Sequence, residues 1–317
     1  MPNPTTENVH VNRPLTNIAI NWIQSQDRFV ADEIFPYVGV DKKSDDYFKF
    51  NKNDLTRIEA KKLAAGSESA GSGYRVDTDT YTAEVYAFHK DIADQIRANS
   101  DNPLDPDRNA TQHVMQNLLM KREKIFGDNF MSSDGDNWTN SEDSENWSED
   151  SGSPILDIRN AISTVGEYWA DANVAVMGKK LFDELMNHSD FLDRIKYTQE
   201  GVVTEELMAR VLDLDAIYVS KATHSTAEEG EEASMARCIP TESLLLVHIP
   251  DTPQIDVPSA GYTFGWENLS GADGLNVAMQ SMRADLRHSD RIEGQMAFDM
   301  KQVASDLGYL FTDTLSA

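Results

Sequence analysis

Residues 51–76 separate two segments with strand character, yet they contain almost no bulky hydrophobic side chains. The flanking runs YFKF (47–50) and DTYTAEVYAF (79–88) are aromatic, β-branched and roughly alternating, which is typical of strands. A structureless connection of this length is uncommon in a compact domain, where loops above about 15 residues are rare. We therefore predict an extended hairpin over 47–88 that projects about 40 to 50 Å, at about 3.3 Å per residue.

This predicted hairpin has no hydrophobic face with which to pack on its own chain. Isolated two-stranded hairpins are only marginally stable in water, so a second surface must stabilise it. We expect its tip, near residues 60–73, to contact a neighbouring subunit. Arg57, Lys61 and Lys62 are the candidates for ion pairs with acidic groups of that neighbour, each contributing about 0 to 1 kcal/mol.

The charge balance limits the partners that the chain can bind. Acidic residues (54) outnumber basic residues (28), and the formal net charge is -26. Tight binding to DNA needs clustered Lys and Arg, so this composition excludes nucleic acid as the main ligand and predicts only weak, local contact. The apolar fraction of 40% and the charged fraction of 26% are those of a globular protein, with one large domain or two interleaved ones.

Nothing in the sequence predicts export or a membrane anchor. The single cysteine, Cys238, cannot form an intrachain disulfide, which is typical of a protein that folds inside the cell. No stretch approaches the roughly 18 apolar residues of a membrane span, and the N-terminus has no signal-peptide pattern. We expect a soluble protein.

A long helix is predicted over residues 107–130. Asp105 is a good N-cap, Pro106 suits the first helical position, and Gly127 is expected to weaken or end the helix. Near its C-terminal end, Lys121, Arg122 and Lys124 have two interpretations that we weigh equally. They form a sparse positive stripe that makes the weak contact with DNA, or they complement the helix dipole and pair with nearby acids.

Residues 132–153 are acidic, rich in Ser and Asn, and without a basic residue. We predict a solvent-facing loop or mobile tab that is dispensable for folding, because such a composition buries too little to offset its ordering entropy. Trp138 and Trp147 are the two side chains that would contradict this prediction. Beyond Pro154, helices and strands alternate, which indicates a compact α/β layer; the predicted helices are 155–170, 179–188 and 204–213, and the predicted strands are 173–178, 216–220 and 243–249.

The sequence contains no complete catalytic, cofactor-binding or metal-binding motif. The run GSESAGSG lacks the patterns of a nucleophile elbow, a dinucleotide loop and a P-loop. Asp105, Asp107 and Asn109 begin like a calcium loop, but Ala110 and Gln116 stand where glycine and a bidentate acid are needed. The insert acids Asp134, Asp136, Glu142 and Asp143 are at most weak cation ligands, and a Cys238–His248 dyad has only coexistence to support it. We predict no enzyme and no cofactor.

Five runs in the same order resemble the major capsid proteins of tailed phages with the Hong Kong 97-type fold. They are FVADEIFPYVGV (29–40), SESAGSGY (67–74), VYAFHKDIADQIRANSDNPLDPDRNATQ, which begins at Val85, FLDRIKYTQEGVVT (191–204) and PSAGYTFGW (258–266). The resemblance implies an α+β fold with an arm (1–44), a projecting E-loop hairpin (45–88), a peripheral domain with a spine helix and the acidic insert (89–153), an inserted α/β axial domain (154–271), and peripheral C-terminal strands (272–317).

The resemblance further implies a structural protein of the virion that self-assembles in the host cytoplasm. Copies would form hexamers and pentamers of an icosahedral shell around double-stranded DNA, with scaffolding, portal and decoration proteins as further partners. Two alternatives remain from the residues alone. One is another virion component, such as a connector or decoration protein, and the other is a hydrolase that uses the acids of 132–153, which would have to be buried.

Overall fold

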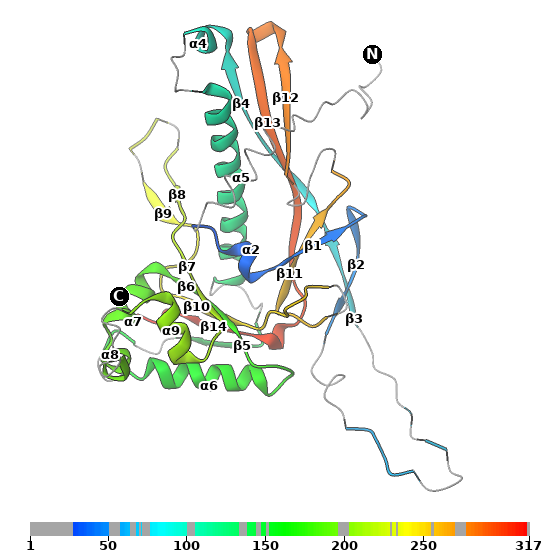
Figure 1. The fold of residues 1–317 in the computed structure, drawn as a ribbon, viewed down its shortest axis with the longest axis vertical. Helices are drawn as coiled ribbons and strands as arrows, with labels where there is room; N and C mark the ends of the chain where they lie inside the picture. Colours follow the sequence, from blue (N-terminus) through cyan, green and yellow to red (C-terminus); the bar gives the residue numbers. More distant parts are fainter. Residues whose placement is uncertain are drawn as a thin grey trace.

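In a computed structural model, the described part of the chain forms two five-stranded sheets, two small two-stranded sheets and one long helix (Figure 1). The structure describes residues 28–50, 58–63, 68–69, 71, 77–99, 105–132, 138–143, 147–149, 152–195, 203–228, 230–232, 234–254, 257–269 and 277–315. Among them, no helix is both long enough and apolar enough to cross a membrane.

The first sheet is organised around the 14-residue strand β13 (Ser289–Gln302). On one side β13 pairs first with β12 and then with β11, and on its other side it pairs with β4 over ten residues. The remaining strand, β1, pairs in parallel with β11. These strands are β4 (Glu84–Ala93), β12 (Val277–Ala284), β11 (Gly261–Trp266) and β1 (Tyr37–Val40).

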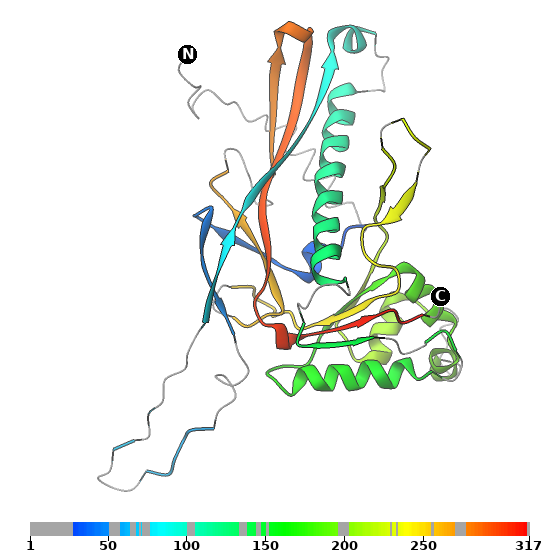
Figure 2. The same cartoon turned by 180° about the vertical axis from the view of Figure 1, so that it is seen from behind.

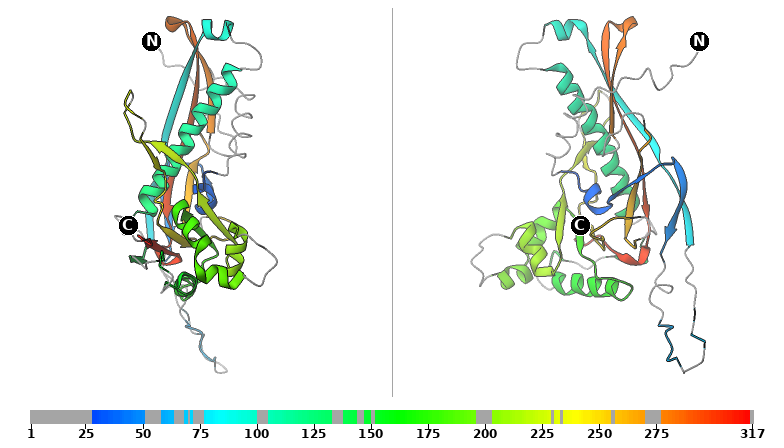
Figure 3. Two further views of the ribbon diagram at one scale, coloured as in Figure 1. Left: turned by 90° about the vertical axis from the view of Figure 1, so that its left-hand side faces the viewer. Right: turned by 45° about the vertical axis from the view of Figure 1, so that its right-hand side comes forward.

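Helix α5 (Pro106–Phe130) packs along the long strands of this sheet (Figures 2 and 3). Asp105 caps it by accepting hydrogen bonds from the backbone N–H groups of Asp107 and Arg108, at 3.1 and 3.3 Å. The predicted helix is confirmed, although it continues past Gly127 to Phe130. Its fully buried face includes Val114, Met115, Leu119 and Phe126.

The second sheet has the order β5-β14-β10-β6-β7 and carries the α/β layer. Its strands are β5 (Asn140–Asp143), β14 (Gly308–Thr312), β10 (Leu244–Val247), β6 (Val174–Gly178) and β7 (Ala216–Ser220). Its helices are α6 (Pro154–Gly166), α7 (Lys179–Asn187), α8 (Ser189–Ile195) and α9 (Glu205–Leu212). The predicted alternation of helices and strands beyond Pro154 is confirmed.

Three strands belong to a different sheet from the one that the sequence order predicts, and one of them is β5, which lies in the predicted peripheral segment but pairs in the second sheet. Strand β11 lies within the predicted axial segment but pairs with β1 and β13 of the first sheet. Strand β14, expected to return to the body that holds the long helix, instead pairs with β10 of the second sheet. The chain therefore passes between the two sheets more often than the contiguous segments of the prediction allow.

The segment after residue 28 is part of the core. Helix α2 (Ala31–Ile34) leads into β1, and the Phe35 ring lies 5.3 Å from Phe126 and 4.6 Å from Phe130 between centroids. Residues 1–27 of the predicted arm lie outside the described residues.

The base of the projecting hairpin is an antiparallel pair, β2 (Ser44–Lys49) and β3 (Asp77–Thr82). Tyr47 and Tyr81 are buried, and their rings pack on Phe264 of β11 with centroids 5.2 and 4.8 Å away. The predicted strand over 79–88 is divided between β3 and β4 at the buried Ala83. The short remaining elements are α4 (Asp94–Ala98), the hairpin of β8 (Thr223–Ser225) and β9 (Met235–Arg237), and the 3-10 turns η2 (Asp285–Arg287) and η3 (Ser305–Leu307).

We expect Gly127→Ala to lower the free energy of unfolding by about 1 to 3 kcal/mol, as overpacking does. A Cβ at this position would lie 2.3 Å from the backbone oxygen of Cys238. Backbone cannot move aside cheaply, so this clash outweighs the gain of about 1 kcal/mol in helix propensity. Denaturant unfolding measures the change, with Gly71→Ala as control, since a Cβ there meets nothing within 4 Å. Equal stability of both variants and the parent protein would contradict the expectation.

Candidate functional site

The described residues do not assemble a catalytic or metal centre. They contain no group of three or more His, Cys, Asp or Glu side chains placed to hold a metal ion. Burial raises the pKa of Cys238 to about 11, so its thiol stays protonated. Its Sγ lies 3.8 Å from Nδ1 of His224, whereas His248 contacts the carbonyl oxygen of Asp171 at 2.9 Å. Cys238 and His248 therefore do not form a dyad, in agreement with the lack of sequence support for one.

The acids considered for a hydrolase fall largely outside the described residues. Asp134 and Asp136 are not among them, and of Glu142 and Asp143 only the backbone is described. That backbone forms β5, which pairs in parallel with β14. This part of the insert is a sheet strand and not a free loop.

Trp138 and Trp147 contradict the prediction that the acidic insert buries almost nothing. Both rings are buried, and the Nε1–H groups donate to the Phe130 carbonyl at 2.8 Å and to Asp157 at 3.1 Å. Each tryptophan buries a large apolar surface, and the stabilisation from burying two of them exceeds the cost of ordering the polar residues around them. The insert is thus docked through its tryptophans, so the predicted solvent-facing tab is wrong at these two residues, and its dispensability for folding stays untested.

The three candidate bases of helix α5, the predicted spine helix, do not form a continuous stripe. Arg122 is buried and pairs with Asp32 of α2. Lys124 pairs with Asp128 one turn further along, and Lys121 is exposed. Position 122 falls on the buried face because it follows Met115, Leu118 and Leu119 at helical spacing. A positive stripe that includes Arg122 is therefore wrong, and pairing with nearby acids holds for Arg122 and Lys124.

Glu123 is the most deeply buried charged side chain of this region, although no local pattern predicts its burial. Its carboxylate accepts hydrogen bonds from the backbone N–H groups of Val30 and Ala31, each at 3.0 Å, and from the Ser220 hydroxyl at 3.0 Å. It thus links α2, the spine helix and β7 of the second sheet. Burial raises the pKa of Glu123 to about 7, although the three donors and Arg122 counteract the rise.

The end of the first sheet that lies away from the second sheet, where α4 and the β12–β13 turn are found, carries a dense network of Arg–Asp pairs (Figure 1). Asp91 pairs with Arg291 at 2.7 Å and with Arg287 at 2.9 Å, and Asp94 pairs with Arg283 at 2.6 Å. Hydrogen bonds from Arg291 and Arg287 hold the pKa of Asp91 at about 2. Arg97 of α4 adds pairs with Asp107 and Asp290, so α4, the spine helix and β13 are joined there.

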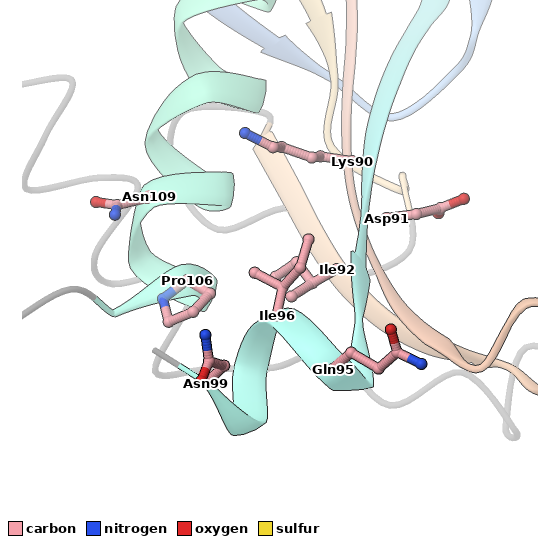
Figure 4. A pocket seen from close by; sticks show the side chains of 8 residues that line it. All are labelled: Lys90, Asp91, Ile92, Gln95, Ile96, Asn99, Pro106 and Asn109. Carbon is pink, nitrogen blue, oxygen red and sulfur yellow. The ribbon is translucent and has the colours of Figure 1, made fainter. Parts of the chain in front are cut away.

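A groove of about 580 Å³ opens at the same end, between β4, α4 and the first turn of α5 (Figure 4). Ile92, Ile96 and Pro106 supply its apolar surface, and the Ile96 side chain is 62% exposed. Its remaining lining residues are Lys90, Asp91, Gln95, Asn99 and Asn109. The groove has no catalytic constellation and fits a surface that binds an apolar side chain.

The predicted contact residues of the hairpin can be followed only in part. Lys61 and Lys62 are exposed, and Arg57 lies outside the described residues. Two hydrophobic side chains next to the lysines are also exposed, Ile58 at 96% and Leu63 at 59%. These residues do not pack on their own chain, and the predicted contact with a neighbour stays a prediction.

Two curated proteins match this chain over nearly its whole length. The major capsid protein of Pseudomonas phage JBD67 is 23% identical over 312 residues, which are 96% of each chain. The major capsid protein of Burkholderia phage BcepMu is 22% identical over 313 residues, or 94% of each. No family model matches the sequence.

Solved structures share the fold. A phage-related protein from Bordetella bronchiseptica RB50 has a TM-score of 0.75 at 16% identity, covering 98% of this chain and 99% of its own. The putative capsid protein of an Escherichia coli CFT073 prophage has a TM-score of 0.56 at 12% identity, covering 97% and 99%. The sequence is thus similar to phage major capsid proteins over nearly its whole length, and the fold is shared with a phage-related protein and a putative capsid protein.

Both curated relatives of this chain are major capsid proteins. A capsid protein is a structural component of the virion, and its functional sites are the surfaces that meet other copies. The candidates on this chain are the hairpin, the groove and the Arg–Asp network at the far end of the first sheet.

Proposed function

We propose that this protein is the shell subunit of a tailed phage, and that its copies assemble into a closed icosahedral capsid around double-stranded DNA. The observation that carries the proposal is the match to two phage major capsid proteins over 94 to 96% of the chain. A match over the whole length favours a shell protein over a connector or decoration protein, since arm, hairpin, spine helix and both sheets are all included.

The proposed fold is the Hong Kong 97 type. In this assignment the peripheral domain is the first sheet with α5, and the axial domain is the second sheet with α6 to α9. The domain limits then differ from contiguous segments, because β11 belongs to the first sheet and β14 to the second. The hairpin (45–88) would extend from this body toward neighbouring subunits, whereas residues 28–40 of the predicted arm (1–44) are part of the body through α2 and β1.

The hairpin is proposed to lie over an adjacent subunit within hexamers and pentamers. The exposed Ile58 and Leu63 provide apolar surface that a neighbouring subunit would bury. Lys61 and Lys62 provide positive charge, and the net charge of -26 gives each neighbour many acidic groups. Arg57 is proposed to act with these lysines. The permanent interfaces of such shells bury about 2,000 Å² or more, so stability is collective.

Other partners follow from the same proposal. The subunits would assemble in the host cytoplasm with scaffolding, portal and decoration proteins, and the shell would carry out no chemistry of its own. The packaged DNA would be a weak partner, since the acidic chain has no surplus of basic residues.

Electron microscopy of the purified full chain tests the proposed function. We expect closed shells or capsomers from the parent protein. A variant in which residues 58–71 are replaced by a short turn should keep its thermal unfolding midpoint, because Tyr47 and Tyr81 still anchor β2 and β3, but it should not form shells. A parent protein that stays monomeric under all assembly conditions would overturn the proposal.

Binding to duplex DNA is expected to be weak and to disappear with salt. On the spine helix, Arg122 and Lys124 already pair with acids of their own chain, which leaves the exposed Lys121 as the base best placed to meet a phosphate. Each phosphate neutralised contributes a slope of about -0.9 in log affinity against log salt. Retention of capsomers on a DNA column across a salt series measures this slope. Submicromolar binding that persists at physiological salt would contradict the expectation.

A further inference from the structure

The second sheet packs directly against the C-terminal half of helix α5. Glu123 and Gly127 lie one helical turn apart, so they share one face of this helix. Ser220, the last residue of β7, donates to the Glu123 carboxyl group at 3.0 Å, and the backbone of Cys238 lies so close to Gly127 that a Cβ there would clash with it. These four residues form a joint between the long helix of the first sheet and the second sheet.

Glu123 is the titratable group at the centre of this joint, and its side chain is fully buried. Its Oε2 accepts from the backbone N–H groups of Val30 and Ala31, whereas its Oε1 faces the Ser220 hydroxyl. A hydroxyl can donate or accept a hydrogen bond. A protonated carboxyl group can therefore donate from Oε1 to Ser220 and still accept both backbone bonds at Oε2. The closed joint thus holds the neutral form of Glu123 without losing a partner.

The charged and titratable groups around the joint come from each element packed there, and they already have partners. The pairs are Arg122–Asp32, Lys124–Asp128, Lys221–Glu205, Tyr218–Glu33 and Cys238–His224. Arg122 favours the ionised form of Glu123, but its guanidinium group is shared with Asp32. Burial is the larger effect and raises the pKa of Glu123 to about 7.

Opening of the joint would let water reach the Glu123 carboxyl group, and its pKa would then return to about 4.5. The open form therefore releases its proton at a lower pH than the closed form does. The stability of the closed joint is fully present below the pKa of the open form and is lost as the pH rises through about 7. The equilibrium constant for opening should rise by up to about tenfold per pH unit and level off near pH 7.

We propose that this joint is a proton-operated hinge between the two large sheets, closed while Glu123 is protonated and loosened when Glu123 ionises. Contacts between the parts of a chain allow relative motion unless they are large and apolar, and this contact has a polar group at its centre. The shape of the subunit would then depend on pH near neutrality. The hinge is a property of the single chain and goes beyond the proposed function.

The thiol of Cys238 reports opening of the hinge, because it is the single cysteine of the chain and is buried at the joint. The unassembled full chain and Glu123→Gln are labelled with dithiodipyridine from about pH 5.5 to about pH 7.5. Glutamine keeps an acceptor but cannot ionise, so the ratio of the two labelling rates removes the pH dependence of the thiol. We expect the parent-to-variant ratio to rise about tenfold or more and to level off near pH 7. A ratio that stays flat or falls with pH would overturn the inference.

Ser220→Ala is a second variant that keeps the carboxyl group of Glu123. It removes one donor to the ionised form, so the pKa of Glu123 should rise, and the pH at which labelling levels off should rise with it. Lys121→Gln is the matched control on an exposed position of the same helix and should label like the parent protein. A Ser220→Ala profile that matches the parent profile would count against the hinge.

Low concentrations of urea separate the hinge from global unfolding. Local opening exposes little surface, so the labelling rate should not change with urea, whereas global unfolding would make it rise steeply. A steep rise in the parent protein would overturn the inference. All these measurements use the unassembled chain, so a parent protein that forms no particles would overturn the proposed function and leave the hinge standing.

Discussion

Glu123→Ala is expected to lower the free energy of unfolding by about 3 to 5 kcal/mol. The substitution leaves the N–H groups of Val30 and Ala31 and the Ser220 hydroxyl without their acceptor. Each buried group that loses its partner costs about 1 to 3 kcal/mol, and part of this cost is recovered if water enters the cavity. The Glu123→Ala substitution also removes the link between three parts of the fold, which are α2, the spine helix α5 and β7.

Denaturant unfolding of the full chain measures this effect under conditions that keep it unassembled. Lys121→Ala is the matched control, because its side chain is exposed two positions earlier on the same helix. It should change stability by no more than about 0.5 kcal/mol. If both variants unfold at the same denaturant concentration, the carboxylate of Glu123 does not hold these elements together.

The pH dependence of the same site has a definite sign. Burial raises the pKa of Glu123 from 4.5 to about 7 in the folded chain, so the folded state holds its proton more tightly than the unfolded state. The associated stability is fully present below the unfolded pKa and is lost as pH rises through about 7.

Comparison with Glu123→Gln isolates this contribution from the other acids. From about pH 5.5 to about pH 8.5, the parent protein should lose stability relative to Glu123→Gln, by up to about 1.4 kcal/mol per pH unit below the folded pKa. Parallel pH profiles of the two proteins would show that the carboxyl of Glu123 titrates normally.

Trp147→Ala is expected to lower the free energy of unfolding by about 3 to 5 kcal/mol. The ring is fully buried, packs 5.1 Å from the Phe311 ring between centroids, and donates to Asp157. The Trp147 backbone N–H also donates to the Thr314 carbonyl at 3.0 Å, so the insert is tied to the C-terminal segment. Removing the indole opens a cavity where β14 and α6 meet.

Trp169→Ala is the matched control, because its side chain is 51% exposed and follows helix α6. Its expected cost is below about 1 kcal/mol, measured by the same unfolding experiment. Deleting residues 132–153 removes β5, Trp138 and Trp147 together, and we expect it to abolish soluble expression. Normal expression of that deletion, or equal stability of both tryptophan variants, would restore the interpretation of the insert as a free tab.

Local patterns in the sequence were sufficient for the elements whose structure depends on near neighbours. The N-cap Asp105, the proline after it and the apolar spacing predicted the spine helix nearly to its ends. The alternation of helices and strands beyond Pro154 was also predicted, because caps and apolar periods act within one turn or a few residues. The resemblance to phage capsid proteins came from short runs in the same order along the chain, and these residues alone indicated the function.

Only the tertiary structure decided which segments pair and which polar groups are buried. Glu123 stands in the charged run KREK and has no local signal of burial, since its donors are 92 to 97 residues away in sequence. The same holds for Trp138 and Trp147 in their acidic surroundings, and for the exchange of β11 and β14 between the sheets. One physical reason explains all of these cases. The free energy of burying a side chain depends on the surface that distant segments supply, whereas the composition of a segment predicts only how that segment would behave alone in water.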